Sequence, residues 1–142
     1  PFGSTVYPLN PLAHALISRG TFVARGFAGD PKHLTSLFVE ALKHKGFSYI
    51  DVFQPCVTFN YLNTYDWFRQ RVYKLDEAGH DYADWQKALE KSLEWGERIP
   101  IGIFYKEERS TYRDGLTHLQ GKSLTEMPIL DVDISPLLES LK

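Results

Sequence analysis

Residues 21–53 read TFVARGFAGDPKHLTSLFVEALKHKGFSYIDVF, and this stretch decides the fold. The runs 21–28 and 47–53 are rich in β-branched and aromatic residues, which favours strands. Between them, Asp30 and Pro31 supply a helix cap and a first-turn proline, and apolar residues then recur at helical spacing until Gly46. A strand–helix–strand unit of this size builds two parallel strands joined by a right-handed crossover. The sequence therefore predicts an α/β fold with a mostly parallel sheet and flanking helices.

Apolar spacing and capping signals predict further helices on both sides of this unit. The expected helices cover 11–19, 65–75 and 82–95, and a short last helix is capped at Ser135. Residues 99–106, IPIGIFYK, predict a third strand. Its alternation places Ile99, Ile101, Ile103 and Tyr105 on one face. Pro100, which lacks an amide hydrogen, either places the strand at an edge or makes residue 99 a lead-in to the strand.

The part of the chain after Arg109 has a different character. Residues 110–123, STYRDGLTHLQGKS, are polar and contain glycine, which is typical of an exposed arm. We therefore expect an α/β domain over 1–109 and a C-terminal arm over 110–142.

The composition excludes several classes of protein. The chain has 142 residues, of which 43% are hydrophobic and 24% charged, as expected for a globular domain. A formal net charge of -2 disfavours nucleic acid as the main partner. With one cysteine there is no internal disulfide, and no apolar run is long enough to span a membrane or form a signal peptide. We expect a cytoplasmic protein that binds neither nucleic acid nor membrane.

Cys56 is the residue with the clearest chemical potential. It follows the second predicted strand, and ligands of parallel sheets sit beyond the carboxyl ends of strands. A single cysteine is most often a small core residue. Here, however, Pro55 fixes the turn, and the side chains of Thr58 and Asn60 are able to hydrogen-bond a thiolate, which suits a metal ligand. A nucleophilic cysteine needs a base. The candidate bases are His14, His33, His44, His80 and His118, and no sequence feature pairs any of them with Cys56.

A longer run around Cys56 carries a family resemblance. Residues 44–60, HKGFSYIDVFQPCVTFN, resemble the signature of the β subunits of 2-oxoacid:ferredoxin oxidoreductases. Residues 10–25, NPLAHALISRGTFVAR, and 99–116, IPIGIFYKEERSTYRDGL, match the same family, so the resemblance covers most of 8–116. The segment VTFN after Cys56 is similar to the 2-oxoglutarate or broad 2-oxoacid branch rather than the pyruvate branch.

The resemblance implies a partial thiamine-diphosphate-binding fold, of which this chain is the C-terminal part. It assigns Cys56 as a metal ligand, the last of four thiolates that hold a [4Fe-4S] cluster. The other three cysteines, and the Gly-Asp-Gly motif for magnesium and thiamine diphosphate, belong to the amino-terminal half of the family's subunit and do not occur in this sequence. We therefore expect the chain alone to hold no cofactor and to be inactive.

The resemblance also implies partners and a reaction. The full complex contains thiamine diphosphate, magnesium and [4Fe-4S], and carries out CoA-dependent oxidative decarboxylation of a 2-oxoacid with electron transfer to ferredoxin. The implied partners are the α subunit, the missing amino-terminal half of the β subunit, and ferredoxin. The alternative is a stand-alone α/β binding or assembly domain without catalytic activity.

Overall fold

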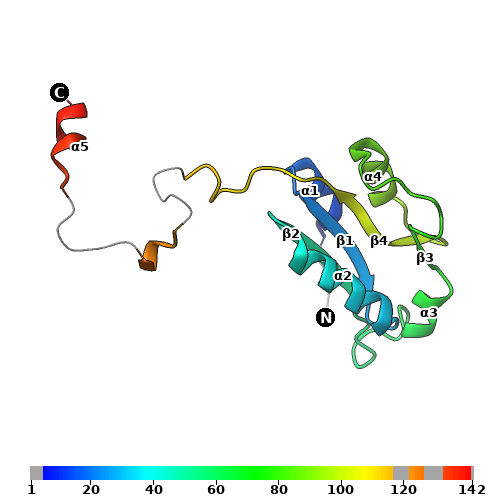
Figure 1. The fold of residues 1–142 in the computed structure, drawn as a ribbon. Helices are drawn as coiled ribbons and strands as arrows, with labels where there is room; N and C mark the ends of the chain where they lie inside the picture. Colours follow the sequence, from blue (N-terminus) through cyan, green and yellow to red (C-terminus); the bar gives the residue numbers. More distant parts are fainter. Residues whose placement is uncertain (1–4, 117–121, 127–132, 142) are drawn as a thin grey trace. The chain divides into compact units, whose positions relative to one another are not determined.

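The computed structural model describes residues 5–116, 122–126 and 133–141. The chain divides into two units, Pro1–Arg109 and Ser110–Lys142. Unit 1 contains a four-stranded sheet with helices on both faces (Figure 1). In unit 2 the described elements are η2 (Leu124–Glu126) and α5 (Ser135–Ser140), and Ile134 rather than Ser135 occupies the N-cap of α5.

The sheet has the strand order β2-β1-β4-β3. Its strands are β1 (Phe22–Phe27), β2 (Ser48–Phe53), β3 (Val72–Lys74) and β4 (Ile99–Lys106). Strands β1 and β2 are parallel over their full length, and α2 (Pro31–Lys43) connects them. Strand β3 is also parallel to β4, whereas β4 is antiparallel to β1. The predicted α/β class with a mostly parallel sheet is therefore confirmed.

Side-chain caps fix where the helices of unit 1 begin. They precede α1 (Pro11–Ile17), α2, α3 (Tyr65–Arg69) and α4 (Trp85–Ser92). Asn10 Oδ1 accepts a hydrogen bond from the Ala13 amide at 3.0 Å, and Asp30 Oδ1 accepts one from the His33 amide at 3.1 Å. Each cap satisfies an amide that has no partner inside the helix. Among the described residues, no helix has the length and apolar character needed to cross a bilayer.

The predicted helix over 65–75 is wrong in its second half. Helix α3 ends at Arg69, and the chain continues as β3. The Ile99 amide donates to the Arg71 carbonyl, and the Leu75 amide donates to the Ile101 carbonyl, both at 2.9 Å. Pairing with β4 therefore prevails over the helical spacing of the apolar residues. Helix α4 likewise begins later than predicted, because Asp84 caps it and Trp85 is its first residue.

Strand β4 lies inside the sheet and already includes Ile99, so both predicted readings of Pro100, an edge strand and a lead-in at residue 99, are wrong. Pro100 is opposite Tyr73 of β3. The hydrogen bonds toward β3 are formed by the backbones of the flanking residues 99 and 101, not by Pro100. The nitrogen of Pro100 therefore faces the β1 side. Pairing with β1 extends only as far as Gly102, so the missing amide hydrogen falls beyond the end of that ladder.

The predicted single apolar face of β4 is also wrong. Ile99 and Ile101 pack with Phe27, whereas Ile103 packs in a different cluster and Tyr105 in a third. Two irregularities break the alternation. Gly102 has a φ of +125°. In addition, the register between β4 and β1 shifts between Val23 and Ala24 of β1.

The helices cover the two faces of the sheet unequally. On one face, Leu37 of α2 packs with Phe22 and Ala24. On the other face, α1 and α4 together cover the part that includes Val23 and Phe104. Helix α3 covers a separate part of the sheet, where its Phe68 packs with Phe27 of β1. This division of the second face positions the candidate site described below.

The contact between β1 and α2 gives a test of the packing. A Cβ atom added at Gly26 would lie 2.4 Å from the Leu34 side chain. We expect Gly26→Ala to lower the free energy of unfolding by about 1–3 kcal/mol, because overpacking forces side chains and backbone to shift. Urea denaturation of the variant measures this. Gly115→Ala is the control, since its nearest contact of 3.4 Å is ordinary, and equal stability of both variants would contradict the packing.

Candidate functional site

Cys56 lies in the loop that follows β2. Its carbonyl accepts hydrogen bonds from the amides of Phe59 at 3.3 Å and Asn60 at 2.9 Å, which forms a tight turn. The side chain is exposed and the thiol is free. Cys56 is therefore not a core residue, and its sulfur is accessible to a ligand or a partner.

Asn60 holds the loop in shape. Its Oδ1 accepts from the amides of Leu62 at 2.9 Å and Asn63 at 3.0 Å, and its Nδ2 donates to Asn63 Oδ1 at 3.2 Å. These bonds engage the Asn60 side chain within the loop. Its effect on Cys56 is therefore to fix the turn that presents the sulfur.

A hollow of 360 Å³ opens beside Cys56. It is lined by Val52, Phe53, Gln54, Pro55, Cys56, Asn60, Asn63, Phe68 and Trp95. The Phe53 and Phe68 rings stack with centroids 4.8 Å apart, and Trp95 meets Phe53 edge-on at 5.8 Å. Aromatic rings thus form an apolar wall behind the thiol.

The structure brings none of the candidate bases to this hollow. His14 is exposed on α1, and His33, His44 and His80 are half-buried at other places in unit 1. His44 lies 2.9 Å from Thr21 Oγ1, and His80 lies 2.8 Å from the Phe104 carbonyl. His118 lies outside the described residues. Within the part of the chain that the structure describes, no three His, Cys, Asp or Glu residues are grouped to hold a metal ion.

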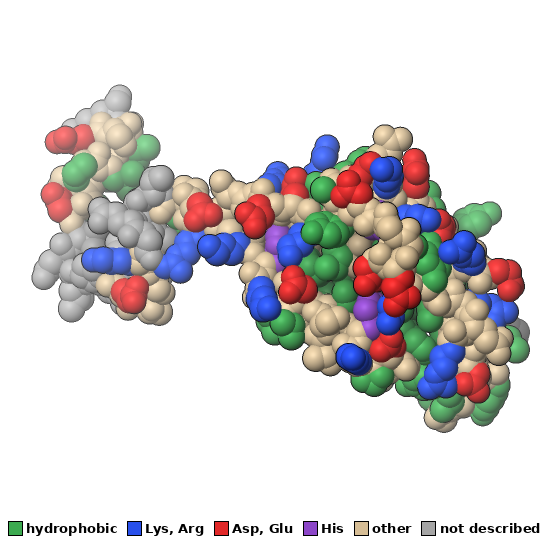
Figure 2. All heavy atoms as spheres, turned by 45° about the vertical axis from the view of Figure 1, so that its right-hand side comes forward, with side chains coloured by type: hydrophobic (Ala, Val, Ile, Leu, Met, Phe, Trp, Pro, Cys, Tyr) green, Lys and Arg blue, Asp and Glu red, His purple; other side chains and the backbone are tan. Residues whose placement is uncertain are grey.

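The loop after Cys56 exposes large apolar side chains. Phe59, Tyr61 and Leu62 are 87%, 78% and 82% exposed. Together with Val57 they form what we call the Cys56 loop surface. Hydrophobic side chains reach the exterior of unit 1 at several places (Figure 2). Several large, exposed apolar side chains in one loop are typical of a surface that another polypeptide buries.

A buried ion pair lies on the side of the sheet that borders the Cys56 hollow. Arg25 Nε is 2.9 Å from Asp51 Oδ2, and the Arg25 side chain is only 5% exposed. The guanidinium also lies 4.7 Å from the Phe53 ring centre. Burial lowers the pKa of Arg25, whereas the bond to Asp51 acts in the opposite direction. Sequence reasoning missed this pair, although Arg25 and Asp51 are the only charged residues of β1 and β2.

One nitrogen of this guanidinium is unused. Arg25 Nη1 is buried and has no hydrogen-bond partner among the described residues. Arg25 and Asp51 line a cavity of 420 Å³, which Phe53 and Trp95 also line. Since Phe53 and Trp95 border the hollow at Cys56 as well, the ion pair and the thiol belong to one continuous surface.

The ion pair predicts a non-additive response to mutation. Asp51→Leu leaves Arg25 buried without its carboxylate, so we expect a loss of about 3 kcal/mol or more in the free energy of unfolding. The double variant Arg25→Met/Asp51→Leu removes both charges and should lose much less. Urea denaturation of both variants measures the difference. A double variant as unstable as Asp51→Leu would contradict the predicted coupling.

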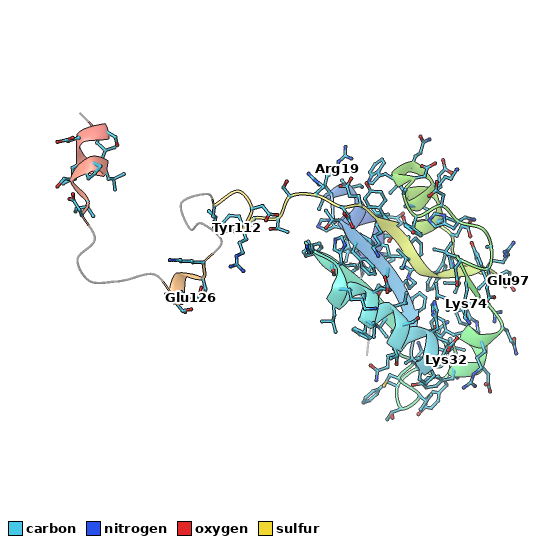
Figure 3. All side chains as sticks on the ribbon, viewed as in Figure 1. Arg19, Lys32, Lys74, Glu97, Tyr112 and Glu126 are labelled. Carbon is cyan, nitrogen blue, oxygen red and sulfur yellow. The ribbon has the colours of Figure 1, made fainter. Side chains whose placement is uncertain are left out.

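His33 lies among charged residues at the start of α2. Lys74, which Figure 3 labels, has its Nζ 3.5 Å from Asp30 Oδ2 and 3.4 Å from Glu77 Oε1. His33 Nδ1 is buried and has no partner among the described residues. Burial lowers the pKa of His33, against the attraction of Asp30. Burial therefore disfavours the charged form of this imidazole.

The lowered pKa of His33 predicts a pH dependence of stability. The unfolded chain, with a His pKa near 6.5, binds a proton that the folded chain resists, so stability falls as the pH drops through that value. We expect the decrease between about pH 7.5 and pH 5 to be smaller in His33→Asn than in the parent. His44, whose pKa burial also lowers, retains its part of the slope. Thermal unfolding at several pH values measures this, and identical slopes would contradict it.

The chain matches one family model. The model describes the C-terminal region of the pyruvate ferredoxin oxidoreductase beta subunit and matches residues 56–121, so the match begins at Cys56. Two similar sequences are β subunits of 2-oxoacid:ferredoxin oxidoreductases. That of a Sulfolobus species is 49% identical over 114 residues, which is 70% of this chain and 36% of the relative. That of Saccharolobus solfataricus is 44% identical over 135 residues, which is 87% of this chain and 44% of the relative.

A solved structure agrees with these sequence matches. The 2-oxoglutarate:ferredoxin oxidoreductase from Magnetococcus marinus, with 2-oxoglutarate, coenzyme A and succinyl-CoA bound, superposes with a TM-score of 0.80 at 32% identity. The alignment covers 100% of this chain and 47% of that chain. The chain thus spans less than half the length of the relatives it matches.

Proposed function

Because the chain belongs to the β-subunit family of 2-oxoacid:ferredoxin oxidoreductases and matches the carboxyl-terminal part of its members, we propose that it forms this part of a β subunit in such an enzyme complex. The substrate is then a 2-oxoacid, CoA accepts the acyl group, and ferredoxin accepts the electrons. An α subunit is the expected partner, and the complex is cytoplasmic. The relatives' names and the compounds bound in the Magnetococcus marinus enzyme support this proposal.

Cys56 is the residue proposed to carry a cofactor contact. The single observation behind this assignment is a free, exposed thiol fixed at the carboxyl end of a paired strand. A thiolate of this kind fits one ligand position of a [4Fe-4S] cluster, which four cysteines usually hold. Cys56 is the only cysteine of this sequence, so in this proposal the other three thiolates come from outside these 142 residues. The cluster, when bound, supplies one-electron transfer to ferredoxin.

The residues around Cys56 fix the direction of its exposed sulfur. Pairing of β2 with β1 through Phe53 fixes the start of the loop, and the turn closed on the Cys56 carbonyl fixes its direction. Phe68 and Trp95 form the apolar side of the hollow. The aromatic wall and the nearby amide side chains of Gln54, Asn60 and Asn63 are factors that would set the potential of a cluster.

Thiamine diphosphate and magnesium bind, in this proposal, outside these 142 residues. The described residues include no carboxylate cluster for magnesium beside the Cys56 hollow, whose polar lining consists of amide side chains and the thiol. This chain therefore contributes a cluster ligand and part of the subunit's structure. The decarboxylation itself depends on the cofactor and on residues of the rest of the complex.

The second candidate function is an assembly domain without catalytic activity. The Cys56 loop surface favours it, since Phe59, Tyr61 and Leu62 offer apolar contact to a partner whether or not iron is present. Iron content separates the two functions, because an assembly domain binds its partner without any metal.

The test uses a chimeric β subunit that joins these 142 residues to the amino-terminal part of the Saccharolobus solfataricus subunit. It is produced with the other subunit of that enzyme and purified anaerobically. We expect Cys56→Ser to lose the iron and visible absorbance of one cluster and to lower ferredoxin reduction to background, because a hydroxyl is a poor substitute for a thiolate ligand. Iron analysis and the visible spectrum measure this.

Thr58→Ser is the matched control, because it alters an exposed side chain of the same loop and leaves the thiol in place. It should keep the iron and the activity. Unchanged iron content and an unchanged spectrum in Cys56→Ser would refute the assignment of Cys56 as a ligand.

A further inference from the structure

Three amide side chains border the hollow beside Cys56. They belong to Gln54, Asn60 and Asn63. A hydrogen bond donated to a sulfur of an iron-sulfur cluster changes the reduction potential of that cluster. The three amides differ in how the loop orients them, and this difference shows which of them is a fixed donor.

The orientation of the Asn60 amide is fixed by two backbone groups. Its side chain accepts hydrogen bonds from the amides of Leu62 at 2.9 Å and Asn63 at 3.0 Å. A backbone amide only donates, so the accepting atom of Asn60 is the oxygen Oδ1, and the remaining atom is the nitrogen Nδ2. Asn60 therefore offers a donor to its next partner.

The orientation of the Asn63 amide follows from that of Asn60. Asn60 Nδ2 donates to Asn63 Oδ1 at 3.2 Å, and this donor requires an oxygen opposite it. Asn63 Nδ2 is then the atom that the pair leaves unused, and it donates to none of the described residues. Unlike Arg25 Nη1, it is not buried, so it is accessible from outside the chain.

The backbone of Asn63 is held on both sides. Its amide is bonded to Asn60, and the next residue, Thr64, is the N-cap of α3. Helix α3 is in turn anchored by Phe68, which is 7% exposed. Gln54, by contrast, is exposed, and its side chain forms no hydrogen bond with a described residue. Asn63 is therefore the half-buried amide of the hollow whose unused donor has a fixed direction.

We propose that Asn63 donates a hydrogen bond from Nδ2 to the sulfur at Cys56 and thereby raises the reduction potential of the cluster, and that Asn60 is the positioning residue for this donor. The inference rests on the proposed function. A hydrogen bond to sulfur stabilises the reduced cluster more than the oxidised cluster, because the reduced cluster carries more negative charge. Both amides lie in the loop that presents the thiol, and they border the same hollow as Cys56.

The test uses the chimeric β subunit with the amino-terminal part of the Saccharolobus solfataricus subunit. A redox titration followed by electron paramagnetic resonance measures the reduction potential of its cluster. We expect Asn63→Leu to keep the iron and to lower the potential, because the donor is lost. The expected change is about tenfold in the equilibrium constant of reduction, or about 59 mV for a one-electron couple.

Gln54→Leu is the matched comparison, because it removes an amide of the same hollow that no hydrogen bond orients. It should change the potential much less than Asn63→Leu does. An unchanged potential in Asn63→Leu, or equal shifts in the two variants, would overturn the proposal. Loss of the iron in Asn63→Leu would also overturn it, because residue 63 would then act by holding the loop together.

Asn60→Asp tests the positioning role. The new carboxylate still accepts from the amides of Leu62 and Asn63, but it has no hydrogen to donate. Asn63 then turns its Nδ2 toward residue 60 and its oxygen away from it, so we expect the potential to fall although residue 63 is unchanged. The added negative charge lowers the potential as well, and the double variant Asn60→Asp/Asn63→Leu separates the two effects.

The double variant distinguishes an effect through Asn63 from an effect of charge alone. If Asn60 acts through Asn63, the shift of the double variant is smaller than the sum of the two single shifts. Additive shifts would overturn the positioning role of Asn60.

These outcomes are separable from those of the proposed function. Iron and visible absorbance that do not depend on Cys56 would refute the ligand assignment, and the inference with it. A cluster that depends on Cys56 and keeps its potential in Asn63→Leu would support the proposed function and refute only the role of Asn63.

Discussion

The parallel pairing of β1 with β2 is the contact on which the rest of unit 1 depends. Every residue of β1 is buried, so β1 is the centre of the sheet, with β2 on one side and β4 on the other. Helix α2 exists in this place because it joins the two parallel strands across one face. The loop with Cys56 then starts where β2 ends, so the position of the thiol is a direct consequence of the strand register. A shift of one residue would turn the side chains of β2 to the opposite face.

The face of the sheet opposite α2 contains a buried ion pair at a place where a purely apolar contact would be simpler. Arg25 and Asp51 are placed between the part covered by α1 and α4 and the aromatic residues around Phe68. A buried pair of this kind adds little stability by itself. Its two charges nevertheless fix the relative position of β1 and β2 at their centre, because the Nε–Oδ2 bond joins residues that are register partners. One nitrogen of the same guanidinium, Arg25 Nη1, is buried without a hydrogen-bond partner among the described residues.

The sequence predicted those elements whose signals are local. The caps at Asn10 and Asp30 and the β-rich runs around β1 and β2 are determined by residues next to each other in the chain, and they were predicted correctly. Strand β3 was missed because its three residues are a strand only through bonds to β4, far away in sequence. The interior position of β4 was missed for a related reason. The missing amide hydrogen of Pro100 matters only where β4 is hydrogen-bonded to β1, and no local signal in the sequence shows where that pairing ends.

For the candidate site, the sequence identified the residue but not its surroundings. Cys56 was located from its place after a strand and from the resemblance, whereas Trp95 and Phe68, which complete the hollow, come from distant segments. The structure adds that the loop with the thiol begins where β2 ends, and that β2 pairs only with β1 among the described strands.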